Sequence, residues 1–208
     1  MLYLVRHGQT QYNAERRIQG QLDTPLSDEG RRQAELLAER LKAEGPFVTK
    51  LYCSELRRAG ETARIVGRRL GLTPVSIEGI QEINFGMFQG HTFEESARLY
   101  PEQYADFLIH GCYSCAHGGE TGPQVLERAR RALLKLPESR GGRALVICHG
   151  AVIGYLSAAV QGVPLSDSRQ FIPDNTGVVP FDEAAMEKLR QYDGGREYEA
   201  HNSIQQQA

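Results

Sequence analysis

Two short apolar runs in this chain each lead directly into a His-Gly dipeptide. The runs and the residues that follow them are Leu2–Val5 with Arg6, His7 and Gly8, and Ala144–Cys148 with His149 and Gly150. Apolar runs of this length, bounded by turn residues, predict strands that are buried on both faces. Ligands of open α/β sheets bind beyond the carboxyl ends of such strands. If both strands belong to one sheet, His7, His149 and Arg6 converge on one crevice, and this set suits an anion, phosphate above all.

Strand and helix patterns alternate along the chain. This alternation predicts an α/β fold, a three-layer sandwich in which helices flank a mostly parallel central sheet. The expected strands cover residues 2–5, 47–53, 74–78 and 143–148. One helix is expected to begin at Ser27, a second to follow Ser54 as its cap, and a third to begin at Pro123. A further, buried helix is expected over 151–160. The free backbone N–H groups at the amino end of that last helix are expected to add to an anion site.

The length of 208 residues predicts a single domain over residues 1–208. Residues 79–120 are irregular and are expected to form a lid over the carboxyl edge of the sheet, with short helices near 92–99 and 101–109. The tail over 176–201 predicts a strand and a hairpin that turns at residues 193–195, with a helix over 182–190 as the alternative.

Composition excludes some partners. A formal net charge of −2 argues against nucleic acid as the main partner, because proteins that bind phosphate backbones usually carry a basic excess. No apolar stretch is long enough to cross a membrane, and the first residues show no secretory signal, so we expect no membrane partner and a cytoplasmic protein. The four cysteines do not form the pattern of a small disulfide-bonded domain.

Several further motifs occur in a fixed order around these two strands. They are Leu4–Thr10 with Asn13, Ile18–Gly30, Ser54–Ala63, Glu82–Gly90, Gly118–Thr121 and Val146–Gly150. This ordered set, which extends from residue 2 to about 177, resembles the signature of the histidine phosphatase (phosphoglycerate mutase-like) superfamily. The Arg-His-Gly tripeptide alone is a weak signal, but the ordered set is highly specific.

The resemblance implies catalytic roles that the chemistry of the side chains supports. His7 would attack phosphorus through its neutral imidazole and form a phosphohistidine. Arg6, Arg58 and His149 would neutralise the phosphate oxygens, and Asn13 would add a neutral donor. In the family pattern the functional arginine directly precedes alanine, which selects Arg58 over its neighbour Arg57.

The resemblance also implies an acid and a substrate-binding set. Glu82 would protonate the departing alkoxide and then deprotonate the attacking water, and desolvation by the lid would favour its acid role. Gln19, Gly20 and Gly150 are expected to contact substrate together with Asn13. No metal and no cofactor are expected, because the arginine and histidine groups do the work that Mg²⁺ does elsewhere.

The same site can release phosphate to water or pass it to another hydroxyl. Where the mutases of the family carry a lysine this chain aligns Phe93, and where they carry an arginine pair it aligns Ile109 and His110. We therefore expect a phosphomonoester hydrolase for a small phosphorylated metabolite, resembling the broad-specificity and α-ribazole phosphatases. A phosphoglycerate mutase and a non-catalytic binder of phosphorylated ligands are the alternatives. The sequence identifies neither the substrate nor the oligomeric state, and a homodimer is one of the open alternatives.

A second cluster lies inside the expected lid. It contains His110, Cys112, Cys115 and His117, four residues of the types that bind zinc. Four ligands from eight consecutive residues are sterically tight for one ion, and the two cysteines alone resemble a redox pair. An ordinary lid loop is the preferred interpretation, with zinc binding and redox switching as the alternatives.

Overall fold

One five-stranded sheet organises the chain. In the computed structural model, which describes residues 1–43, 45 and 47–193, the strand order is β3-β2-β4-β1-β5. The strands are β1 (Leu2–Arg6), β2 (Lys50–Ser54), β3 (Pro74–Ile77), β4 (Ala144–Cys148) and β5 (Val178–Phe181). The β1–β4, β2–β4 and β2–β3 pairs are parallel, and β5 runs antiparallel to β1. The predicted α/β fold with a mostly parallel sheet is confirmed.

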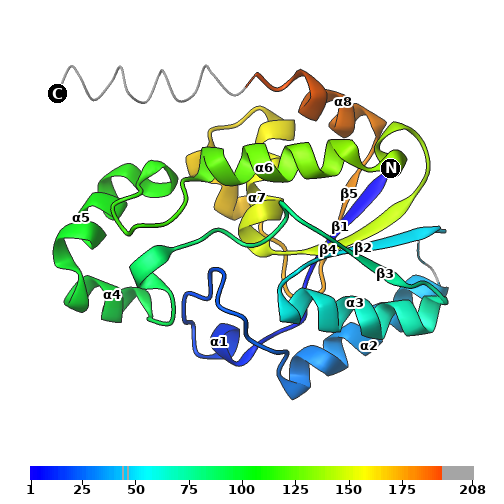
Figure 1. Cartoon of the computed structure of the whole chain (residues 1–208), viewed down its shortest axis with the longest axis horizontal. Helices are drawn as coiled ribbons and strands as arrows, with labels where there is room; N and C mark the ends of the chain where they lie inside the picture. Colours follow the sequence, from blue (N-terminus) through cyan, green and yellow to red (C-terminus); the bar gives the residue numbers. More distant parts are fainter. Residues whose placement is uncertain (44, 46, 194–208) are drawn as a thin grey trace.

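Helices cover both faces of this sheet. The helices are α1 (Gln11–Ala14), α2 (Asp28–Ala43), α3 (Arg57–Leu70), α4 (Phe93–Leu99), α5 (Pro101–His110), α6 (Gly122–Lys135), α7 (Gly150–Gln161) and α8 (Glu183–Gln191). Four 3₁₀ segments are η1 (Gly86–Phe88), η2 (Gly111–Tyr113), η3 (Pro137–Arg140) and η4 (Leu165–Phe171). Helices α2 and α3 lie on one face and α6, α7 and α8 on the other (Figure 1). These are the three predicted layers.

The side-chain alternation of a strand explains why two cores form. Leu2 and Leu4 point to one face of β1 and belong to a cluster with residues of α6, α7 and α8. Val5 points to the other face and belongs to a cluster with residues of α2 and α3. Each face of β1 is therefore apolar, as expected for a parallel strand covered by helices on both sides.

The predicted helix beginning at Ser27 is confirmed. The Ser27 Oγ accepts a hydrogen bond from the Gly30 N–H at 3.0 Å and so caps α2. The predicted cap at Ser54 is wrong, because Leu56 precedes α3 and makes no side-chain cap. The Ser54 hydroxyl instead lies 2.8 Å from the Nε2 atom of His149.

The tail follows the helical alternative. After β5, Asp182 caps α8 by accepting a hydrogen bond from the Ala185 N–H at 2.8 Å. The expected strand is therefore present as β5, but the chain then continues as a helix over Glu183–Gln191 rather than as a hairpin. The expected turn at residues 193–195 lies outside the described residues from 194 onward.

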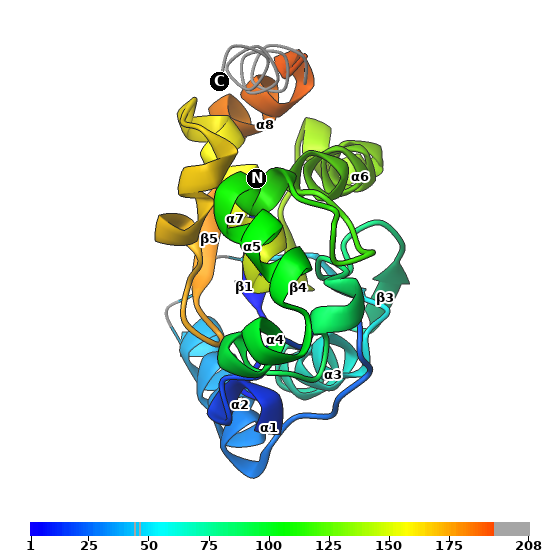
Figure 2. The same cartoon turned by 90° about the vertical axis from the view of Figure 1, so that its left-hand side faces the viewer.

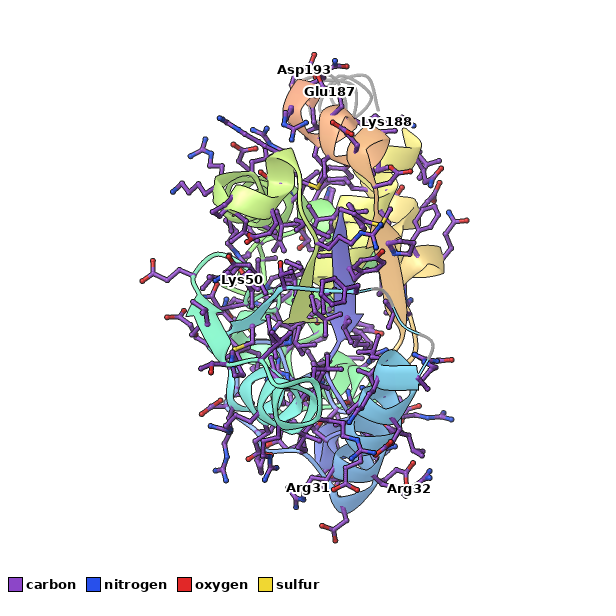
Figure 3. The ribbon with its side chains drawn as sticks, turned by 90° about the vertical axis from the view of Figure 1, so that its right-hand side faces the viewer. Arg31, Arg32, Lys50, Glu187, Lys188 and Asp193 are labelled. Carbon is purple, nitrogen blue, oxygen red and sulfur yellow. The ribbon has the colours of Figure 1, made fainter. Side chains whose placement is uncertain are left out.

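Charged side chains gather at the periphery of the sandwich. Figure 3 shows Arg31 and Arg32 of α2 at one end of the molecule and Glu187 and Lys188 of α8 at the other. Most ion pairs on these helices join residues three or four positions apart on exposed faces, and such pairs contribute little to stability. Within the described part of the chain, no helix is both long and apolar enough to cross a bilayer.

Residues of the expected lid form two helices and an aromatic cluster. Helices α4 and α5 stand apart from the main sandwich beside the α1 region (Figures 1 and 2). Buried Phe88 packs against them, because its ring lies 6.2 Å from that of Tyr100, 6.1 Å from Tyr104 and 5.9 Å from Phe107. Packing of the lid therefore absorbs several of its aromatic side chains.

One close backbone approach positions the loop that follows β1. A Cβ atom added at Gly30 would lie 1.9 Å from the Gln9 carbonyl oxygen, and one added at Gly8 would lie 2.4 Å from the Gly30 carbonyl oxygen. Only glycine allows the amino end of α2 to pass this close to the loop. The position of His7 therefore depends on contacts between two glycines that lie far apart in the chain.

We expect Gly30→Ala to lower the free energy of unfolding by about 1–3 kcal/mol, because its Cβ overlaps backbone that cannot rotate away. Gly60→Ala in α3 is the matched control, since a Cβ there meets nothing within 4 Å. The control should raise stability by up to about 1 kcal/mol, as alanine in place of glycine does in a helix. Urea denaturation of both variants tests this, and equal effects would contradict the close approach.

Candidate active site

The ends of β1 and β4 bring the two predicted histidines together. Arg6 pairs with Cys148 in the parallel register, and the His7 N–H donates to the Cys148 carbonyl at 3.0 Å. The ring centroids of His7 and His149 are 5.2 Å apart, with a tilt of 59°. The predicted convergence of the two imidazoles at one edge of the sheet is therefore present.

The hydrogen bonds of His7 determine its tautomer. Its Nδ1 atom lies 2.7 Å from the Gly8 carbonyl oxygen, which can only accept, so Nδ1 carries the proton. Its Nε2 atom lies 3.2 Å from the Nε–H of Arg58, which can only donate, so Nε2 holds a lone pair. Burial, and then the positive charge of Arg58, lower the pKa of His7 well below its ordinary value. The ring is therefore neutral and has a nucleophilic nitrogen.

Arg58 is fully buried beside His7. Its Nη1 and Nη2 atoms donate to the carbonyl oxygens of Leu22 and Gly20 at 2.9 and 2.7 Å. Burial lowers the pKa of Arg58 to about 10, so it remains a cation at neutral pH. The neighbouring Arg57 is exposed and pairs with Glu61 at 2.9 Å, so it lies at the periphery as expected.

Arg6 is the second cation at the edge of the sheet. Its Nη1 atom donates to the Pro173 carbonyl at 2.8 Å, and its buried Nε has no hydrogen-bond partner among the described residues. Burial lowers the pKa of Arg6, while the charges of Glu82 and Asp174 favour its protonated form. An unpaired buried donor is costly unless something accepts from it, which fits a position prepared for an anion.

His149 lies beside His7 in the protein interior. It is fully buried, and burial followed by the charge of Arg58 lowers its pKa well below the ordinary value. The lowered pKa favours a neutral ring, and the role of His149 towards phosphate stays a prediction. Its Nε2 bonds to Ser54, its Nδ1 has no partner among the described residues, and the ring lies beside His7 without forming part of the cavity wall.

Glu82 lies across the amino end of α7. Its Oε1 accepts from the Ile83 N–H at 3.0 Å, and its Oε2 accepts from the Ala151 N–H at 3.2 Å. The amide that was expected to bind an anion directly therefore holds a carboxylate. This contact joins the expected lid segment to the helix that follows β4.

Arg128 of α6 holds the segment that carries Glu82. Its guanidinium donates to the carbonyl oxygens of Gly79, Gln81 and Glu82 at 2.7–3.0 Å, and pairs with Glu120 at 2.7 Å. Sequence reasoning missed Arg128 because no local signal marks a helix arginine as a ligand of a distant backbone. Glu120 lies within the motif Gly118–Thr121, but the sequence predicted no role for it.

A cavity of about 770 Å³ opens at this edge of the sheet. Four of the predicted catalytic residues and all four predicted substrate-binding residues line it, namely Arg6, His7, Arg58, Glu82, Asn13, Gln19, Gly20 and Gly150. The sheet ends, the α1 loop and the expected lid thus contribute to one cavity. The roles of these residues remain predictions, but the structure brings them together.

Two asparagines lie beside the α1 loop, and one of them contacts His7. Asn13 accepts from the Thr10 N–H at 3.1 Å through Oδ1 as part of the α1 cap. Asn175 donates to the His7 carbonyl at 2.9 Å and lies 3.5 Å from the Asn13 Oδ1. Sequence reasoning missed Asn175, which follows η4 in a loop without a motif of its own.

The cysteine and histidine cluster of the lid is dispersed. His117 is buried among aromatic rings, with its ring 5.8 Å from Phe85 and 5.4 Å from Phe88, whereas Cys115 is exposed. His110 lies 2.9 Å from Asp106. Across the described residues, no group of three or more histidine, cysteine or acidic side chains is placed to hold a metal ion. The zinc alternative therefore has no support in the structure.

The family model of the histidine phosphatase superfamily (branch 1) matches residues 2–192. The chain belongs to this superfamily. Its similarity to a curated protein of Arabidopsis thaliana, phosphoglycerate mutase-like protein 4, is 37% identity over 158 residues, or 74% of this chain and 68% of that protein. The family suggested by the ordered motifs is thus confirmed.

Two solved structures of phosphatases share the fold. The mycobacterial glucosyl-3-phosphoglycerate phosphatase, in a complex with VO₃, is 33% identical, with a TM-score of 0.71 over 85% of this chain and 90% of that one. The α-ribazole phosphatase from Shigella flexneri is 26% identical, with a TM-score of 0.77 over 88% and 91%. Together with the mutase-like relative, these neighbours indicate phosphatase or mutase catalysis.

The two lowered histidine pKa values predict how stability depends on pH. In the unfolded chain these imidazoles take up protons below about pH 6.5, whereas buried His7 and His149 stay neutral. The unfolded state then binds more protons, so the free energy of unfolding should fall as pH drops from 6.5, by at most about 1.4 kcal/mol per pH unit for each ring.

Urea denaturation at pH 7.0, 6.0 and 5.5 measures this dependence. His149→Gln removes one of the two rings and should flatten the slope below pH 6.5 by up to half of their joint contribution. An unchanged slope in that variant would show that His149 takes up its proton in the folded state as well.

Proposed function

We propose that this protein hydrolyses phosphomonoesters through a phosphohistidine on the Nε2 atom of His7. The observation that carries the proposal is the pair of contacts that gives His7 one tautomer: Nδ1–H faces the Gly8 carbonyl and the Nε2 lone pair faces the guanidinium of Arg58. A nitrogen that is neutral and held beside a cation is suited to attack phosphorus in a bound dianion.

The proposed reaction has two steps. In the first, Nε2 forms a bond to phosphorus while the ester P–O bond breaks, and Glu82 gives its proton to the departing alkoxide. In the second, water attacks phosphorus and passes a proton to the Glu82 carboxylate, the N–P bond breaks, and inorganic phosphate leaves. Arg6 and Arg58 offset the charge of the phosphoryl oxygens in both steps, and neutral His149 supports the set as a hydrogen-bonding group.

Hydrolysis is favoured over a mutase reaction by the wall of the cavity. Where the family's mutases carry basic groups this chain aligns Phe93, Ile109 and His110. Phe93 contributes an apolar ring to the wall, whereas His110 lies 2.9 Å from Asp106 and outside the cavity wall. The two phosphatase neighbours support the same choice. The proposed substrate is a small phosphorylated metabolite.

One assay separates hydrolase, mutase and binder. The protein is incubated with p-nitrophenyl phosphate and, separately, with 3-phosphoglycerate and 2,3-bisphosphoglycerate. Release of inorganic phosphate supports the hydrolase, formation of 2-phosphoglycerate supports the mutase, and no turnover in either mixture supports a binder.

His7→Ala should abolish hydrolysis of p-nitrophenyl phosphate, with a loss in kcat on the order of 10⁴-fold or more, because no other group supplies the nucleophile. His91→Ala is the matched control, since His91 is half-buried on the lid side and lies outside the cavity wall. The control should keep its activity, and both variants should retain the circular dichroism of the folded protein. Substantial turnover by folded His7→Ala would rule out the phosphohistidine.

Glu82→Gln should slow the hydrolysis of alkyl phosphates by about 10²–10⁴-fold, because an alkoxide needs a proton as it leaves. The loss should shrink to about tenfold or less with p-nitrophenyl phosphate, whose leaving group needs little protonation. A series of aryl and alkyl phosphates measures this dependence. Equal losses along the series would remove Glu82 from the acid role.

A further inference from the structure

Two arginines line the cavity without an assigned role. Arg16 follows α1, and Arg169 belongs to η4, so they come from segments far apart in the sequence. Both are exposed, and neither has an acidic partner within 4 Å among the described residues. Arg6 and Arg58 supply the positive charge at the buried end of the same cavity. The wall of the cavity therefore carries exposed positive charge in addition to the charge of Arg6 and Arg58.

The other charged groups of the cavity wall are already engaged. Arg17 pairs with Glu15 at 2.9 Å and with Glu95 at 2.6 Å. Glu120 is held by Arg128, and the Glu82 carboxylate accepts two backbone N–H groups. Arg16 and Arg169 are thus the charged side chains of the described wall that remain available to a ligand outside the phosphate position.

The backbone at Arg16 indicates that its placement is imposed by its surroundings. Its φ of 56° lies in the left-handed region, which side chains other than glycine adopt rarely and at a cost. Hydrogen bonds on either side hold the turn: the Arg16 N–H donates to the Asn13 carbonyl at 3.2 Å, and the Arg17 side chain donates to the Gly90 carbonyl at 2.9 Å. The turn is therefore attached to the lid segment.

An aromatic surface forms another part of the same wall. The rings of Phe93 and Phe107 stack with centroids 6.1 Å apart and an interplanar angle of 16°, and both line the cavity. Tyr104 and Leu108 extend this surface along α5. A planar or apolar body can lie against it while its charged ends reach the arginines.

We propose that Arg16 and Arg169 form a second anion subsite, so that the preferred substrates are phosphomonoesters with a second oxyanion on an apolar or planar body. The fork of an arginine side chain suits a carboxylate and a phosphate alike. The inference rests on the proposed function, in which Arg6 and Arg58 hold the phosphoryl group that reacts.

The subsite also refines the comparison with the mutases. Of the aligned mutase positions, Phe93 and Ile109 are uncharged, and His110 lies beside Asp106 outside the cavity wall. The basic groups over the pocket come here from the α1 loop and from η4 instead. A second anion on the substrate therefore does not require the mutase reaction.

A pair of nearly isosteric probes isolates the second charge. The acid 4-(carboxymethyl)phenyl phosphate and its amide, 4-(carbamoylmethyl)phenyl phosphate, differ in that charge and share their phosphate and ring. The third probe, 4-(phosphonomethyl)phenyl phosphate, distinguishes a phosphate-like oxyanion from a carboxylate. Binding to His7→Ala is measured by calorimetry at low salt, so that turnover is not needed for the readout.

The acid should bind about tenfold tighter than the amide, as two partly exposed ion pairs allow. Arg16→Gln with Arg169→Gln should reduce this ratio to about one, and the double lysine variant should keep most of it. Arg40→Gln, an exposed arginine of α2 outside the cavity wall, is the matched control and should leave the ratio unchanged. Tighter binding of the phosphonate than of the acid would identify a phosphate-like group as the second anion.

Equal binding of acid and amide, or a ratio that survives the double glutamine variant, would overturn the subsite. Hydrolysis of p-nitrophenyl phosphate by the unmodified protein tests the proposed function separately, so a failure of the subsite alone is distinguished from a failure of the proposed function. Failure of folded His7→Ala to bind any of the three probes would overturn both.

Discussion

The parallel pairing of β1 with β4 is the contact on which the site depends. The ladder places Arg6 opposite Cys148, and the hydrogen bond from the His7 N–H to the Cys148 carbonyl extends it by one residue. The two imidazoles therefore extend from the same edge of the sheet, next to each other. A shift of this register by one residue would turn the apolar side chains of β1 to the wrong faces, so the two cores that make the fold stable also determine the distance between the rings.

Burial then determines the chemistry of these groups. Arg58 lies within the protein with each guanidinium nitrogen bonded, which offsets part of the cost of removing its charge from water. Burial, and then the charge of Arg58, lower the pKa of both His7 and His149 and so favour neutral rings. A cation next to a neutral base is a stable combination, whereas two protonated rings at 5.2 Å beside an arginine would repel one another. The arrangement that suits His7 to the proposed nucleophilic role is thus also the one that folding tolerates.

Local patterns were enough to predict most of the fold, but not the contacts that join distant segments. The strands at 2–5 and 143–148 and the cap at Ser27 follow from apolar runs and turn residues, which act within a few positions. Ser54 shows where this reasoning ends: a serine after a strand suits a helix cap and a histidine partner equally, and only the fold chooses between them. The lowered pKa of His149 and the contacts of Arg128 and Asn175 arise from burial and tertiary packing, which no spacing in the sequence records.

Reaction and selectivity depend on different parts of the cavity. Arg6 and His7, which would act on the phosphate, lie at the end of β1. Buried Arg58 lies in the first turn of α3, and half-buried Glu82 lies in the segment that Arg128 holds. The free arginines and the aromatic surface come from the α1 turn, the lid and η4, which are outside the sheet and tolerate substitution more readily. The relatives carry names that point to different phosphorylated compounds, although they share the fold. In this chain the proposed second anion would be met by arginines of the α1 turn and of η4, outside the sheet edge that carries His7. Substrate preference in this chain should therefore be sought in Arg16 and Arg169 rather than at the aligned mutase positions.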